Sequence, residues 1–129
     1  MAAATKEQAR AGRTNWKTWN PKERGTLCFV LRGDEILLIE KKRGLGAGKV
    51  NGPGGRIEPG ETAEQAAIRE TQEEIGITPV GIDWAGELSF DFRDGYSLHC
   101  TVYRAGEFHG ELVETAEAKP FWHPVGEMP

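Results

Sequence analysis

Three glutamates in the middle of the chain have a spacing that suits metal chemistry. Glu70, Glu73 and Glu74 stand at positions i, i+3 and i+4, which puts their carboxylates on one face of a helix. Like charges at this spacing repel each other by roughly a few tenths of a kcal/mol per pair, and a bound cation would turn that repulsion into ligation. Mg²⁺ takes carboxylate oxygens and usually keeps waters and phosphate oxygens as its other ligands. The spacing therefore indicates either a solvated acidic face or a magnesium site that acts on phosphates.

The residues that precede this helix favour the magnesium site. Residues 44–60 contain seven glycines and two prolines. That composition predicts a loop whose backbone can approach a ligand closely. Glu61 stands at the start of the helix and Arg69 directly precedes the triplet, so a further carboxylate and a cation accompany the three glutamates.

The elements that must position these residues follow from periodicity and from end signals. Thr62 and Gln65 form a capping-box pattern and Gly76 is placed to end the helix, so we expect a helix over residues 63–75. Apolar runs predict strands at residues 26–32, 35–40, 82–92, 97–105 and 119–123. Trp84 and Trp122 are expected in the core or in a pocket wall. One helix among several strands predicts an α+β domain, with the helix packed on a mixed sheet.

Length, charge and cysteine content narrow the class of protein. The chain has 129 residues and a formal net charge of −4, which suits one domain and does not suit a binder of duplex nucleic acid. We expect a basic, flexible leader over residues 1–24 and a globular domain over residues 25–129. No apolar run is long enough for a transmembrane helix, no secretory signal is present, and Cys28 and Cys100 are expected to be buried thiols. These features predict a cytoplasmic enzyme without membrane contact.

The chain around the predicted helix resembles a known family. Residues 55–77, GRIEPGETAEQAAIRETQEEIGI, are similar to the Nudix box of the Nudix hydrolases. The positions that agree with the box are Gly55, Glu61, Arg69, Glu70, Glu73, Glu74, Gly76 and Ile77. Thr71 departs from it, because the family has an aliphatic residue there, and we expect Thr71 to face the core side of the helix. The resemblance extends over residues 26–129.

The resemblance implies a Nudix fold, an α/β/α sandwich around a mixed β-sheet, and an active site that uses Mg²⁺, with Mn²⁺ as the alternative ion. Glu73, Glu74 and the Gly55 carbonyl would be metal ligands, and Glu70 would be a ligand or the general base that activates water. Glu61 would support the metal cluster, and Arg69 would orient a glutamate through a bidentate pair. Glu117, with Glu114 as the nearby alternative, would complete the cluster from a distant loop.

Within the family, residues 41–61 are most similar to MutT-related enzymes that hydrolyse oxidised purine nucleoside triphosphates such as 8-oxo-dGTP. This similarity implies in-line attack of water on phosphorus, which yields a nucleoside monophosphate and pyrophosphate. Asn51 would hydrogen-bond the purine, and Lys41 either attracts the polyphosphate or belongs to a solvated strand end. The expected substrate-binding residues are Thr26 at the floor of the base pocket, Lys41, Asn51, Gly54, Phe90 and Leu98.

The sequence leaves several alternatives open. The chain stops at Pro129, before the Trp-Pro-Asp-Asp segment and the second helix with which these relatives read the purine edge and cover the sheet. We therefore expect either a truncated or minimal form or another way of recognising the base. We also expect a monomer, or a homodimer in which a partner covers an apolar sheet face. The alternative functions are a Nudix hydrolase of ADP-ribose, a nucleotide sugar or a dinucleoside polyphosphate, and a non-catalytic nucleotide-binding module.

Overall fold

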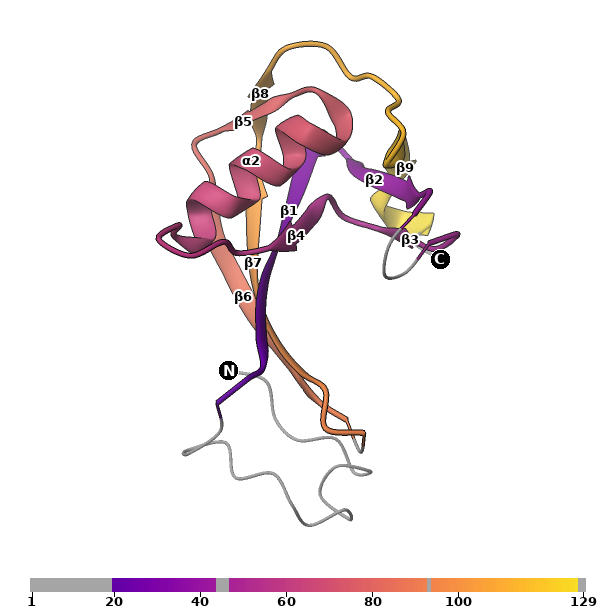
Figure 1. Ribbon diagram of the computed structural model, residues 1–129. Helices are drawn as coiled ribbons and strands as arrows, with labels where there is room; N and C mark the ends of the chain where they lie inside the picture. The colour runs from indigo at the N-terminus through magenta and orange to yellow at the C-terminus, as the bar shows by residue number, and fades with distance from the viewer. Residues whose placement is uncertain (1–19, 44–46, 93, 128–129) are drawn as a thin grey trace.

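Strands dominate the structure, a computed structural model that describes residues 20–43, 47–92 and 94–127. The strands are β1 (Glu23–Arg32), β2 (Glu35–Lys41), β3 (Val50–Asn51), β4 (Gly54–Arg56), β5 (Thr78–Val80), β6 (Asp83–Asp91), β7 (Ser97–Ala105), β8 (Glu107–His109) and β9 (Ala118–Pro124). The helices among these residues are the α-helix α2 (Ala63–Ile75) and the short 3-10 helix η1 (Val125–Glu127). Figure 1 shows α2 lying across β1 and β4, with the hairpin of β6 and β7 extending away from it.

A mixed sheet is organised around β1. The strands follow one another in the order β3-β2-β1-β7-β6, while β4 pairs with β1 and β9 pairs with β2. β1 runs parallel to β7, with Glu23 opposite Leu98 and Val30 opposite Ala105, whereas the other pairings in this sheet are antiparallel. The one parallel pairing therefore joins the first strand of the domain to a strand that comes much later in the chain.

The α-helix forms where its end signals predict it. The Thr62 hydroxyl accepts a hydrogen bond from the Gln65 N–H at 3.1 Å, and the Gln65 side chain accepts one from the Thr62 N–H at 2.9 Å. Gly76 ends the helix with a φ of 79°, in the left-handed region. The buried face of α2 consists of Ala66, Ala67, Thr71, Glu74 and Ile75. One carboxylate of the glutamate triplet is thus withdrawn from solvent, and Thr71 faces the core as predicted.

The core lies between α2 and the sheet. Its buried members are Cys28, Val30, Leu37, Ile39, Ala67, Ile75, Ile77, Ala105 and Ala118. Both cysteines are buried and free, as predicted, and burial raises the pKa of each thiol to about 11. They therefore stay protonated at neutral pH and act as small apolar side chains. The α+β prediction is confirmed.

Several sequence predictions need correction. The expected loop over residues 44–60 contains two short strands, β3 and β4, because backbone pairing with β2 and β1 does not require a run of apolar side chains. Two further strands, β5 and β8, were not predicted, since each has only three residues and they form a separate pair with each other. Trp84 is 57% exposed on the edge strand β6, so its expected place in the core was wrong. Trp122 does pack against the core, beside Phe108.

The beginning of the domain also differs from expectation. β1 starts at Glu23 rather than Thr26, because its pairing with β7 already begins there and the Lys22 N–H donates to the Ser97 hydroxyl at 2.8 Å. The leader expected over residues 1–24 lies outside the described residues up to residue 19. In the part of the chain that the structure describes, α2 is the only α-helix, so the second helical layer of a sandwich is not found there. No helix in these ranges is long and apolar enough to cross a membrane.

The close approach of β4 to β1 gives a first prediction. A Cβ on Gly54 would lie 2.0 Å from the Thr26 carbonyl oxygen and 2.9 Å from the Leu27 Cα, and backbone atoms cannot move aside cheaply. We expect Gly54→Ala to lower the free energy of unfolding by about 3 kcal/mol, measured by urea denaturation. Gly86→Ala is the control, because nothing lies within 4 Å of a Cβ there, and it should change stability by less than about 0.5 kcal/mol. Equal stability of the two variants would contradict this account.

Candidate active site

Arg69 is the centre of an ion-pair network beside the glutamates of α2. Its Nε and Nη2 donate to the two carboxylate oxygens of Glu61 at 2.7 and 3.0 Å, which is the bidentate pair expected from the resemblance. Its Nη1 donates to Glu70 at 2.6 Å and reaches Glu73 at 3.3 Å, and its Nη2 also donates to the Arg56 carbonyl at 2.9 Å. One guanidinium therefore joins α2 to the preceding loop and to β4.

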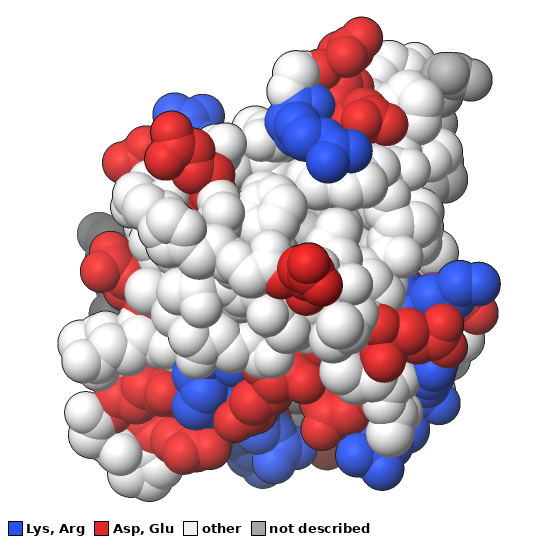
Figure 2. Space-filling model, turned by 90° about the horizontal axis from the view of Figure 1, so that it is seen from above, with Lys and Arg blue, Asp and Glu red and all other residues white. Residues whose placement is uncertain are grey.

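The network shifts the proton affinities of its members. The hydrogen bonds from Arg69 lower the pKa of Glu61, and those to Glu61 and Glu70 raise the pKa of Arg69. Both shifts favour the charged forms of Glu61 and Arg69. On the face of the molecule in Figure 2, acidic and basic side chains lie next to one another along the lower edge.

Glu70 lies directly over Gly55. A Cβ on Gly55 would stand 2.3 Å from a Glu70 carboxylate oxygen, so glycine leaves room for this carboxylate where it lies. Burial raises the pKa of Glu70, although Arg69 acts in the opposite direction, and the charges of Glu73 and Glu117 raise it further. The Glu70 carboxylate and the Gly55 backbone therefore occupy one small space, as a shared metal site would require.

Glu74 is the most deeply buried of the three glutamates, with 2% of its surface exposed. Its carboxylate accepts a hydrogen bond from the Gly54 N–H at 2.8 Å. Burial raises the pKa of Glu74 to about 7, and the charges of Glu70 and Glu117 contribute, while the Gly54 hydrogen bond and Lys41 oppose the shift. A carboxylate that is poorly compensated by the protein is one that a cation would stabilise.

Glu117 approaches this cluster from the far end of the chain. Its charge acts on both Glu70 and Glu74, and its carboxylate lies 3.5 Å from the Arg43 guanidinium. Glu114, the alternative that the sequence left open, instead forms an ion pair with Lys42. The geometry therefore favours Glu117 over Glu114 as the distant member of the cluster.

The donor set fits a hard divalent ion, but the side chains are arranged around Arg69. Glu70, Glu73, Glu74 and Glu117 offer carboxylate oxygens and Gly55 offers a carbonyl, the ligands that Mg²⁺ and Mn²⁺ prefer. Within the described ranges, no three carboxylate, imidazole or thiol side chains are gathered so that they could hold an ion as they stand. Arg69 engages both Glu70 and Glu73. Ligation by these two carboxylates would therefore require them to release Arg69.

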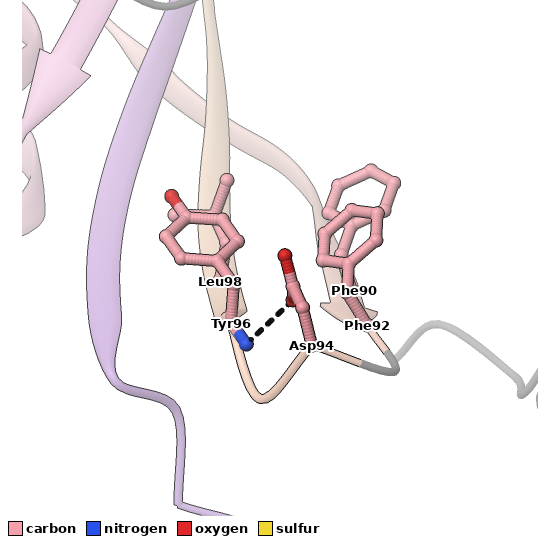
Figure 3. A pocket seen from close by; sticks show the side chains of 5 residues that line it. All are labelled: Phe90, Phe92, Asp94, Tyr96 and Leu98. Atoms are coloured by element: carbon pink, nitrogen blue, oxygen red, sulfur yellow. Dashed lines mark hydrogen bonds between the residues drawn. The ribbon is translucent and has the colours of Figure 1, made fainter.

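An apolar pocket lies at the end of the β6–β7 hairpin (Figure 3). It has a volume of about 410 Å³ and is lined by Phe90, Phe92, Asp94, Tyr96 and Leu98. The rings of Phe90 and Phe92 are stacked, with centroids 6.1 Å apart, and Asp94 accepts a hydrogen bond from the Tyr96 N–H at 2.9 Å. Phe90 and Leu98 were expected in a base pocket. Phe92 was missed, although its alternation with Phe90 along a strand could have revealed it.

Gly25 connects this pocket with the carboxylate cluster. A Cβ on Gly25 would lie 3.2 Å from the Gly55 carbonyl oxygen and 3.6 Å from Leu98 Cδ1. The candidate metal carbonyl and a pocket wall are thus separated by a residue without a side chain. Gly25 therefore lies between the Gly55 carbonyl and one residue of the pocket lining.

The remaining expected substrate contacts lie elsewhere. Thr26 is 1% exposed and does not line the pocket, and among the described side chains its hydroxyl is the one buried polar atom without a hydrogen-bond partner. Asn51 is exposed on β3, where its side-chain oxygen accepts from the Gly52 N–H at 2.8 Å. Lys41 ends β2, close enough to Glu74 to lower its pKa, and Gly54 serves as the donor to Glu74. The structure thus associates Lys41 and Gly54 with the cluster rather than with the pocket.

Arg69 gives a prediction about this network. Lysine keeps the charge but lacks the planar fork, so Arg69→Lys loses the bidentate pair with Glu61 and the bond to the Arg56 carbonyl. We expect the free energy of unfolding to fall by about 1 to 2 kcal/mol in urea denaturation, after allowance for partial exposure to solvent. Arg56→Lys, at a side chain that is 77% exposed, is the matched control and should be near neutral. If both variants lost the same stability, Arg69 would not hold the network together.

Comparison with known proteins agrees with this geometry. The NUDIX domain family matches residues 21–129. The chain is 41% identical over 105 residues to the oxidized purine nucleoside triphosphate hydrolase of Danio rerio, which covers 81% of this chain and 67% of that protein. It is 52% identical over 81 residues to the 8-oxo-dGTP diphosphatase of Escherichia coli (strain K12), covering 63% of this chain and 55% of that protein.

A solved structure agrees as well. The MutT NUDIX hydrolase from Burkholderia pseudomallei superimposes with a TM-score of 0.77 at 30% sequence identity, covering 86% of this chain and 88% of that one. Nudix hydrolases generally use divalent metal ions and act on small nucleotides. The helix that carries Glu70, Glu73 and Glu74, the strand at Gly55 and the mixed sheet that supports both therefore have a common origin with these enzymes, and the chain belongs to the Nudix hydrolase family.

Proposed function

We propose that this protein hydrolyses an oxidised purine nucleoside triphosphate, such as 8-oxo-dGTP, to the nucleoside monophosphate and pyrophosphate, with Mg²⁺ as the ion and Mn²⁺ as a substitute. The observation that carries the proposal is the position of the Glu70 and Glu74 carboxylates beside the Gly54–Gly55 backbone, with the charge of Glu117 acting on both. The likeness to the fish and bacterial enzymes supports the substrate class. A cytoplasmic location, a monomer or homodimer, and a flexible leader ahead of β1 stay predictions.

The proposed metal site uses the glutamates of α2. Glu73, Glu74, Glu117 and the Gly55 carbonyl would hold the ion, with Glu70 as a further ligand or as the base. When bound, the ion would neutralise phosphate oxygens and orient the attacking water. The buried, mutually repelling carboxylates of Glu70 and Glu74 support this assignment, since a divalent cation would relieve both the repulsion and the burial of charge.

Other side chains around the cluster would transfer a proton, position the glutamates and bind the phosphates. Glu70 would accept the proton of the attacking water, and its raised pKa makes it a better base near neutral pH than an exposed glutamate. Arg69 would hold Glu70 and Glu61 in register through the network described above. Lys41, whose charge reaches Glu74, would meet the polyphosphate chain.

The apolar pocket would receive the base. Aromatic rings offer a flat surface for stacking of a purine, and the volume of about 410 Å³ lies in the range of small-molecule sites. Gly25 lies between Leu98 and the Gly55 carbonyl and has no side chain, and in this proposal the sugar and phosphates would pass it to reach the carboxylates. Asn51 would act as a purine contact only if the base reached β3.

A substrate panel tests the proposal. Product release would be measured with and without Mg²⁺ from 8-oxo-dGTP, 2-hydroxy-dATP, dGTP, ADP-ribose and a diadenosine polyphosphate. We expect Mg²⁺-dependent pyrophosphate release, fastest from an oxidised purine triphosphate, because the site joins an apolar base pocket to a carboxylate cluster. Preference for ADP-ribose or the dinucleotide would keep the Nudix chemistry and replace the substrate. No turnover of any compound would favour a non-catalytic nucleotide-binding module.

Glu70 gives a second functional prediction. Glu70→Gln keeps the size of the side chain and its capacity to accept from Arg69, but it removes the proton acceptor. We expect kcat to fall by about 10²- to 10⁴-fold with little change in the circular dichroism spectrum. Glu64→Gln, an exposed glutamate in the first turn of α2, is the matched control and should retain wild-type kcat. Unchanged turnover in Glu70→Gln would remove Glu70 from the mechanism.

A further inference from the structure

The segment between β8 and β9 is hydrogen-bonded to the C-terminal end of α2. The Val113 N–H donates to the Ile75 carbonyl at 3.0 Å, and the Thr115 hydroxyl donates to the Glu74 carbonyl at 2.6 Å. The last carbonyls of a helix have no partner within the helix and must find one elsewhere. This segment supplies those partners just where the helix carries Glu74.

The Thr115 hydroxyl makes three hydrogen bonds. Besides its bond to the Glu74 carbonyl, it accepts from the N–H of Glu117 at 3.1 Å and from that of Ala118 at 3.3 Å. A hydroxyl has one donor and two acceptor lone pairs, so its whole capacity is used. The backbones of Glu74 and Glu117, which are distant in the sequence, are thereby fixed to a single oxygen atom.

Other bonds hold Glu117 from the opposite direction. Its carbonyl accepts from the Lys42 N–H at 2.8 Å, and its carboxylate faces the Arg43 guanidinium at 3.5 Å. The Thr115 N–H also donates to the Ala118 carbonyl at 2.9 Å, which closes a tight turn around Glu117. Within this arrangement, the side chain that connects the turn to α2 is that of Thr115.

We propose that Thr115 is a positioning residue that sets the separation of Glu74 and Glu117, so that the two carboxylates act on one metal site. The inference rests on the proposed function only in taking these two glutamates as ligands, and it holds for any substrate. Groups that orient metal ligands through hydrogen bonds typically change metal affinity or activity by about 10- to 100-fold when they are replaced. Thr115 touches no substrate in this scheme and acts through Glu74 and Glu117.

The test compares Thr115→Val, which has the same shape without the hydroxyl, with Thr115→Ser, which keeps it. Thr78→Val is the matched control, because the Thr78 hydroxyl accepts from the Gln72 side chain at 2.9 Å near the same end of α2 but away from the carboxylates. Mn²⁺ binding would be measured directly by electron paramagnetic resonance on the full chain, alongside urea denaturation without metal. The Mg²⁺ dependence of kcat and KM would be measured on the best substrate.

We expect Thr115→Val to raise the Mn²⁺ dissociation constant and the Mg²⁺ concentration for half-maximal kcat about tenfold or more, with KM for the nucleotide little changed. Thr115→Ser should bind Mn²⁺ like the wild type, and so should Thr78→Val even if it loses stability. In a Glu117→Gln background, Thr115→Val should weaken Mn²⁺ binding little further, because one of the two carboxylates whose separation Thr115 sets is already removed.

Wild-type Mn²⁺ affinity in Thr115→Val, or equal loss in the valine and serine variants, would overturn the proposal. Full additivity with Glu117→Gln would overturn it too. Should Thr115→Val not fold, Thr115→Ala against Thr115→Ser decides the question in the same way. Mn²⁺ binding is measured without turnover, so this test stays valid if the substrate assignment is wrong. If the wild type hydrolyses the substrate and removal of the Thr115 hydroxyl changes nothing, the positioning role of Thr115 is refuted and the proposed function stands.

Discussion

The structure depends on the close approach of β4 to β1 on one side and to α2 on the other. β4 can enter this space because Gly54 and Gly55 have no side chains, and the room that they leave is filled by the Thr26 carbonyl and by the Glu70 carboxylate. The buried Gly54 N–H donates a hydrogen bond to the Glu74 carboxylate. The backbone of β4 and the carboxylates of Glu70 and Glu74 thus occupy a space that ordinary side chains would otherwise fill. This arrangement creates the candidate metal site.

Without a bound cation, the positive charge of Arg69 reduces the repulsion among these carboxylates. Its guanidinium contacts four glutamates, Glu58, Glu61, Glu70 and Glu73, and a carbonyl. It therefore offsets part of the repulsion that the i, i+3, i+4 spacing creates. Glu74 lies outside its reach, and burial shifts the proton affinity of Glu74 furthest toward the neutral form. The ion-pair network and a bound cation would therefore compete for Glu70 and Glu73, and binding of the cation would weaken their bonds to Arg69.

The parts of this site that follow local rules could be predicted from the sequence, and the parts that depend on distant pairing could not. The capping box at Thr62 and the left-handed Gly76 are set by neighbouring residues, so the helix was predicted with its observed ends. β4 escaped prediction because its strand character comes from pairing with β1 rather than from its own composition. Glu117 was reached only through the family resemblance, and Thr115 was missed, because its partners lie on an element that no spacing in the sequence connects to it.

The parallel pairing of β1 with β7 has a consequence for the order of assembly. Lys22 and Ser97, which are bonded at the start of this pair, are separated by 75 positions, and Glu117 follows later still. Contacts of such long range form slowly, because the entropy of closing the intervening loop is lost before they contribute stability. During synthesis, β1, β4 and α2 are made first, whereas β7 and the segment that carries Glu117 follow later. We expect the emerging chain to acquire its central strand pairing, and with it a defined cluster of glutamates, only after β7 has left the ribosome.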